Sequence, residues 1–145
     1  MARSDKPVTK TDLQQLSQQR EIEARALLDL GHIVGAYYLA GYAVECALKA
    51  VIVKRVQMSD SWPPLSFTEK QCFTHILVEL AALAGLDVTP ESLGMPLFLS
   101  WNLAIQWSEP VRYSTTVDPT EARRICTAIL DPTEGVLQWI RSHWG

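Results

Sequence analysis

Residues 33–53 form a nearly uncharged run in which the polar side chains recur at helical spacing. Only Glu45 and Lys49 are charged within it, and Tyr38 and Tyr42 precede them at matching intervals. These four residues, called here the polar line, share one side of an α-helix whose other sides are apolar. Because a helix that is apolar on three sides must be covered by protein, the chain needs several further helices to bury it.

The two opposite sides of this helix predict different neighbours. Away from the polar line, five alanines fall on one narrow stripe, which favours the close approach of another helix; they are Ala36, Ala40, Ala43, Ala47 and Ala50. On the polar line, Glu45 and Lys49 are an i, i+4 pair that contributes only a few tenths of a kcal/mol if exposed. Two tyrosines beside such a pair leave three interpretations: a solvated face, a subunit interface, or a groove for a ligand or RNA.

The composition of the chain limits which classes of protein it can belong to. The chain has 145 residues, 48% of them hydrophobic, and a net charge of −3, which predicts one domain and argues against a basic footprint over its whole surface. The first fifteen residues lack the apolar stretch of a signal peptide, and Glu45 and Lys49 disfavour a membrane span. We therefore expect a cytoplasmic protein without membrane contact. Its three cysteines predict neither a disulfide framework nor a metal site, and no cofactor is indicated.

The hydrophobic periodicity predicts an all-α fold: an antiparallel up-and-down bundle of four main helices plus a short extra helix. A flexible arm over residues 1–10 is expected to precede a single helical domain over 11–145. The expected helices cover residues 11–30, 33–55, 69–84, 97–107 and 118–144, and no strand is expected. Gly31 and His32 leave a very short connection, so the first two helices must pack antiparallel.

The start of the last helix is clear from the sequence, but whether the helix continues past Pro132 is not. Asp118 is a good N-cap, and Pro119 suits the first helical position. Pro132 then interrupts the helix, while the apolar register continues through Leu137 and Ile140. We predict one kinked helix; the alternative is a break, with a second helix capped by the repeated Asp-Pro-Thr-Glu at 131–134.

The run GHIVGAYYLAGYAVECALKA at residues 31–50 resembles the signature helix of HEPN domains. Two shorter elements occur in matching order: Thr74-His75-Ile76-Leu77 is similar to the family's "THDL" element, and Arg112-Tyr113 to its "RY" element. The resemblance covers about residues 12–143. It implies a four-helix bundle that dimerises through its early helices, and a gene paired with a minimal nucleotidyltransferase as a toxin–antitoxin module.

Many HEPN proteins are metal-independent ribonucleases with an R-x(4–6)-H motif near the last helix. Neither Arg123 nor Arg124, in the last helix here, is followed by histidine at that spacing. The sequence therefore favours a binding partner that recognises nucleotide or RNA without cleaving it. The polar line, together with Arg112 and Tyr113, is its predicted binding or interface surface.

The alternative is a ribonuclease toxin with a non-standard site. Arg112 is then a candidate phosphate clamp, because its guanidinium matches phosphate oxygens, and Tyr113 a candidate base-stacking residue. His75 has the chemistry for proton transfer. Arg112 and His75 are thus the catalytic candidates, with Glu45 as a further participant; a structural corner at Arg112-Tyr113 and a hydrogen-bonded helix-end histidine are the competing interpretations.

Overall fold

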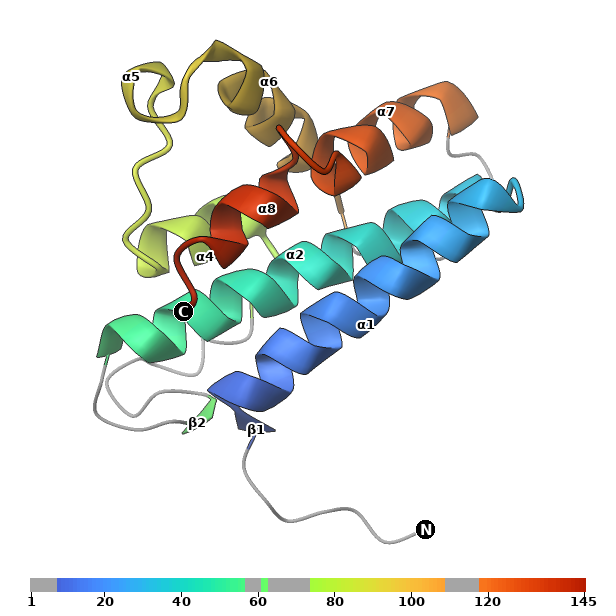
Figure 1. The fold of residues 1–145 in the computed structure, drawn as a ribbon. Helices are drawn as coiled ribbons and strands as arrows, with labels where there is room; N and C mark the ends of the chain where they lie inside the picture. Colours follow the sequence, from blue (N-terminus) through green and yellow to red (C-terminus); the bar gives the residue numbers. More distant parts are fainter. Residues whose placement is uncertain (1–7, 57–60, 63–73, 109–117) are drawn as a thin grey trace, which may run out of the picture.

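The computed structural model describes residues 8–56, 61–62, 74–108 and 118–145. Helix α1 (Lys10–Asp29) begins one residue before the expected start. Thr9 caps it: the Thr9 hydroxyl accepts a hydrogen bond from the Asp12 amide at 3.1 Å, and the Asp12 carboxylate accepts one from the Thr9 amide at 2.9 Å. Gly31, at φ +84°, turns the chain into α2 (Ile33–Val56), so the two helices lie antiparallel, side by side (Figure 1).

Helix α2 is the core of the described structure. All five alanines of the predicted stripe are completely buried. The helix is long and apolar enough to cross a membrane by length and composition, but 72% of its most apolar window is buried by the rest of the chain. The prediction that protein surrounds this helix is therefore confirmed.

The remaining helices are α4 (Leu77–Leu83), α5 (Pro90–Leu93), α6 (Met95–Ala104), α7 (Pro119–Leu130) and α8 (Val136–Arg141). Of these, α4, α7 and α8 pack on α2, while α6 packs on α7 and α8, and α5 packs on α6 (Figure 1). Strands β1 (Val8–Thr9) and β2 (Ser61–Trp62) form one antiparallel pair, with Val8 opposite Trp62. The all-α expectation holds for the described residues; the expectation of no strand was wrong at this pair, which is too short for an alternating pattern to reveal.

The third expected helix differs from the prediction at its start. Residues 74–76 are not helical, and Ile76 is the extended N-cap of α4. The Thr74 side chain instead accepts a hydrogen bond from the Ile76 amide at 3.1 Å. This local hydrogen bond competes with helix formation at residues 74–76. His75 therefore lies in the segment that leads into α4, outside the helix.

The last helix is broken at Pro132, so the prediction of one kinked helix was wrong. Helix α7 ends at Leu130, and α8 begins at Val136. Between them Asp131 Oδ1 accepts hydrogen bonds from the Thr133 and Glu134 amides at 2.8 and 2.9 Å. The Asp131 side chain thus closes a turn that the proline alone does not specify. Beyond the break, Val136 is buried and belongs to the same hydrophobic core.

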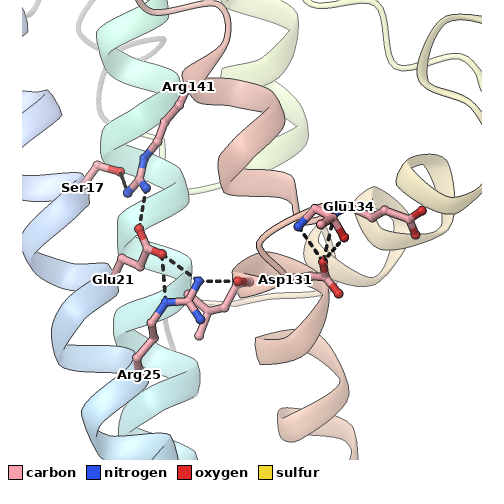
Figure 2. Close-up of polar contacts among 8 residues, drawn as sticks. Ser17, Glu21, Arg25, Asp131, Glu134 and Arg141 are labelled. Atoms are coloured by element: carbon pink, nitrogen blue, oxygen red, sulfur yellow. Dashed lines mark hydrogen bonds and ion pairs between the residues drawn. The ribbon is translucent and has the colours of Figure 1, made fainter.

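Charged side chains at one edge of the core tie α1 to α7 and α8 (Figure 2). Glu21 pairs with Arg25 at 2.8 Å and with Arg141 of α8, and Arg25 also donates to the Leu130 carbonyl at the end of α7. Ser17 is fully buried and donates to the Ala43 carbonyl of α2 at 2.8 Å. This network fixes the direction in which α1 lies on the other helices.

Candidate functional site

Glu45 is the centre of the candidate site, and it is almost completely buried. Its side chain is 5% exposed, and its two oxygens have different partners. Lys49 Nζ donates to Oε2 at 3.1 Å, while His75 Nδ1 lies 2.8 Å from Oε1. Because an isolated carboxylate is costly to bury, these two contacts explain how α2 holds a charge at this depth.

The polar line is consequently not a solvated stripe. Lys49 is 13% exposed, whereas the His75 side chain is 43% exposed at the outer end of the arrangement. His75 comes from the segment before α4, thirty positions from Glu45 in the sequence. The structure thus places His75, the predicted proton-transfer candidate, in contact with Glu45 of the polar line, the predicted binding surface.

The two tyrosines of the polar line form an aromatic border beside this ion pair. The Tyr38 hydroxyl donates to the Tyr42 hydroxyl at 3.1 Å, and their rings meet edge to face at 4.7 Å. The Tyr42 ring lies 6.4 Å from the ring of His75 and 5.4 Å from that of Trp107. Both tyrosines are half-buried, so each is partly accessible at the surface.

A glycine on α2 positions Trp107 against this border. A Cβ placed on Gly41 would lie 1.9 Å from the Trp107 indole, so only glycine lets the ring rest on the helix backbone. The indole Nε1 donates to the Tyr37 carbonyl at 3.1 Å, which fixes the plane of the ring. Trp107 in turn supports Tyr42 from within.

The other border is formed by Trp62. Its ring centroid lies 5.1 Å from Lys49 Nζ, an arrangement in which the aromatic face attracts the ammonium group. Trp62 reaches this place because β2 pairs with β1 at the start of α1. The sequence did not predict this contact, because no local pattern around Trp62 indicates it.

Cys46 is the adjacent thiol, and its surroundings make it a poor nucleophile. Burial raises its pKa to about 11, assisted by the neighbouring Glu45 charge and opposed by Lys49 and Arg20. At neutral pH the thiol therefore stays protonated. Cys46 and Cys126 are both free, and no group of three metal-binding side chains occurs among the described residues. The chemistry of this site therefore rests on its imidazole, carboxylate, ammonium and phenol groups.

The remaining predicted site residues lie outside the described residues. These are Arg112 and Tyr113, so the predicted phosphate clamp and stacking residue stay predictions. Cys72 also lies outside them. The structure therefore brings together five of the seven predicted positions: Tyr38, Tyr42, Glu45, Lys49 and His75.

One arginine–histidine pair in the sequence does have the spacing of the ribonuclease motif. Arg25 and His32 stand at R-x6-H, across the turn between α1 and α2 instead of near the last helix. The Arg25 guanidinium is held by Glu21 and the Leu130 carbonyl (Figure 2), and no hydrogen bond joins Arg25 to His32 in the described part of the chain. The spacing alone therefore does not assemble a site here, because the guanidinium serves helix packing.

Comparisons with protein-family models, with curated proteins and with solved structures found no match to this chain.

Proposed function

We propose that this chain is a HEPN-like four-helix homodimer that acts as the binding partner of a minimal nucleotidyltransferase in a toxin–antitoxin-type module, and that it recognises nucleotide or RNA without cleaving it. The observation that carries the proposal is the Glu45–His75 contact of 2.8 Å. It holds an exposed imidazole in a fixed orientation on a buried carboxylate, beside two partly exposed tyrosines. Rigid aromatic and hydrogen-bonding groups of this kind are enriched at the energetic centres of interfaces.

The distribution of burial supports recognition over a purely structural role. Glu45 and Lys49 are the buried base of the site, whereas Tyr38, Tyr42 and His75 form its accessible edge. A partner that covers this edge gains phenol and imidazole contacts and leaves the internal ion pair unchanged. Because the accessible groups are already held in place, little conformational entropy is lost on binding.

Co-purification tests the partner assignment. The gene beside this one is expected to encode a minimal nucleotidyltransferase, and the two proteins are expected to co-purify when expressed together. Tyr38→Ala and His75→Ala should weaken the complex, while Leu99→Ala, which removes an exposed apolar side chain from α6, should not. The absence of such a neighbouring gene, or equal recovery of the partner with all variants, would oppose the proposal.

Sedimentation tests the homodimer separately. The wild type is expected to sediment as a dimer at micromolar concentration. Glu45 is unsuitable for a charge-reversal test because it is buried, so Tyr42→Ala, at the half-buried edge, is the variant of choice. A wild type that is monomeric at every concentration would exclude the dimer.

A second candidate function, a metal-independent endoribonuclease, is favoured by the same Glu45–His75 pair. With its proton on Nδ1, His75 donates to Glu45 and has Nε2 as its proton-accepting nitrogen. The base would take the 2′-hydroxyl proton of RNA; the 2′-oxygen would bond to the adjacent phosphorus, and the P–O5′ bond would break. The products would be a 2′,3′-cyclic phosphate and a 5′-hydroxyl, whose oxygen takes up one proton.

Incubation with several RNAs in EDTA distinguishes the two functions. Cleavage that disappears in His75→Gln and persists in His32→Gln, at the exposed turn before α2, would establish the ribonuclease and exclude the non-cleaving partner. Intact RNA with the wild type, together with retained partner binding, is the result expected from the first proposal.

A further inference from the structure

A second site lies on α2 beyond the polar line, where the end of this helix meets the ends of α4 and α8. A cavity of about 350 Å³ opens there, lined by Val51, Lys54, Arg55, Ala84, Gly85, Leu86 and His143. Its lining carries two permanent positive charges and one imidazole, and none of these described lining residues is a carboxylate. This charge distribution differs from that of the polar line, where Glu45 is central.

The two cations are held at the rim by backbone carbonyls. Lys54 Nζ donates to the His143 carbonyl at 3.2 Å, and Arg55 donates to the Leu83 carbonyl at 2.8 Å. Lysine carries three donors and arginine five, so each of these contacts engages only part of the group. The carbonyl bonds thus orient the cations and leave donor capacity for a ligand.

Gly85 brings the arginine close to the backbone of the cavity wall. Its φ is +71°, and a Cβ at this position would lie 2.7 Å from the Arg55 Cζ atom. The Gly85 amide also ends α4 by donating to the Ala82 carbonyl at 3.1 Å. A glycine at this position therefore both ends the helix and lets the guanidinium lie flat against the turn.

The partial negative charges at the carbonyl ends of the helices disfavour an anion in this cavity, but the positive charges of Lys54 and Arg55 are larger. The carbonyl ends of α2, α4 and α8 face this region, and each contributes at most about half an elementary negative charge. Lys54 and Arg55 contribute two full positive charges and already cover carbonyls beside the ends of α4 and α8. The cavity therefore keeps a net positive character.

We propose that this cavity binds the phosphate group of a nucleotide or of an RNA backbone, held by Lys54 and Arg55 with His143 at the rim. The guanidinium fork matches two phosphate oxygens, and the lysine supplies a third contact. The site deepens the nucleotide or RNA recognition in the proposed function and rests on it, but it uses none of the residues of the polar line, so partner binding is tested separately.

Titration with pyrophosphate, followed by the backbone amide signals of Gly85 and Leu86, tests the proposal. Binding is expected to shift these signals in the wild type and to weaken at least fivefold in Lys54→Gln and in Arg55→Gln. Arg124→Gln is the matched control, because Arg124 is an exposed arginine paired with Glu121 on α7. Thermal unfolding of each variant confirms that it is folded.

The same signals, followed with ATP and with a short single-stranded RNA, distinguish the source of the phosphate; a shift with either ligand that Arg55→Gln weakens supports the site. Pyrophosphate that leaves the Gly85 and Leu86 signals unchanged would overturn the proposal, as would equal affinity for the wild type and both cavity variants.

Discussion

His75 Nδ1 lies 2.8 Å from Glu45 Oε1, so the segment before α4 is tied to the middle of α2 by an imidazole–carboxylate contact. The carboxylate is buried, and the imidazole is partly exposed. The contact therefore connects the core of the protein with its surface, and several measurable consequences depend on it.

Glu45→Gln is expected to destabilise the protein by about 2–4 kcal/mol, because it leaves Lys49 largely buried without its carboxylate. Glu121→Gln is the matched control, since Glu121 pairs with Arg124 on an exposed face and its loss should cost less than about 1 kcal/mol. Urea unfolding of both variants measures the difference. Equal free energies of unfolding for the two variants would show that the buried pair has no special role.

Gly41→Ala is expected to destabilise the fold by about 2 kcal/mol or more, because the new methyl group would overlap the Trp107 indole. Gly35→Ala is the control within the same helix, where the Cβ would meet only Leu27 Cδ1 at 3.2 Å. The gain in helix propensity, about 1 kcal/mol, should offset that contact. Thermal unfolding compares the two, and a Gly41→Ala variant as stable as the wild type would contradict the placement of Trp107.

The lowered pKa of Glu21 is expected to make the stability of the protein decrease at acidic pH. Burial alone would raise its pKa, but the hydrogen bonds and charges of Arg141 and Arg25 outweigh burial and hold the pKa below its ordinary value. A carboxylate with a lowered folded-state pKa stabilises the protein above its unfolded-state pKa, about 4.3, and this contribution falls as the pH drops through the folded-state value.

The difference in unfolding free energy between the wild type and Glu21→Gln should therefore be larger at pH 7 than at pH 3. Urea unfolding at the two pH values measures it. A difference of the same size at both would mean that the ion pairs of Glu21 contribute no pH-dependent stability.

Asp131→Ala is expected to cost about 1 kcal/mol, because it removes the acceptor that closes the turn between α7 and α8. Asp131→Asn keeps an oxygen at the same position and should recover most of this loss. Thermal unfolding of the two variants provides the comparison. If alanine and asparagine have the same effect, the side-chain hydrogen bonds do not hold the break at Pro132.

The helical fold could be predicted from the sequence because its signals are local. The spacing of apolar residues placed α2 within one residue of its observed end, and Gly31 indicated the turn before it. The break after Leu130 could not be decided in the same way, because Pro132 permits either a kink or a stop. Asp131 settles it through hydrogen bonds to the Thr133 and Glu134 amides, and these compete with helical bonds only once the turn has formed.

The candidate site could be predicted only in part. Helical spacing placed the polar line on one side of α2, since that relation lies within a single element. The contacts of Glu45 with His75 and of Lys49 with Trp62 join separate segments, and no single-sequence pattern encodes their approach. The burial of Glu45 could not be predicted for the same reason: His75, which contacts its carboxylate, lies thirty positions away in the chain.

The accessible edge formed by Tyr38, Tyr42 and His75 is proposed to recognise a partner. Calorimetric titration of the wild type and of Tyr38→Ala with the purified nucleotidyltransferase encoded beside this gene measures that recognition. We expect at least tenfold weaker binding for Tyr38→Ala and unchanged binding for the exposed α6 control Leu99→Ala. Equal affinity for the wild type and Tyr38→Ala, with both proteins folded, would contradict it.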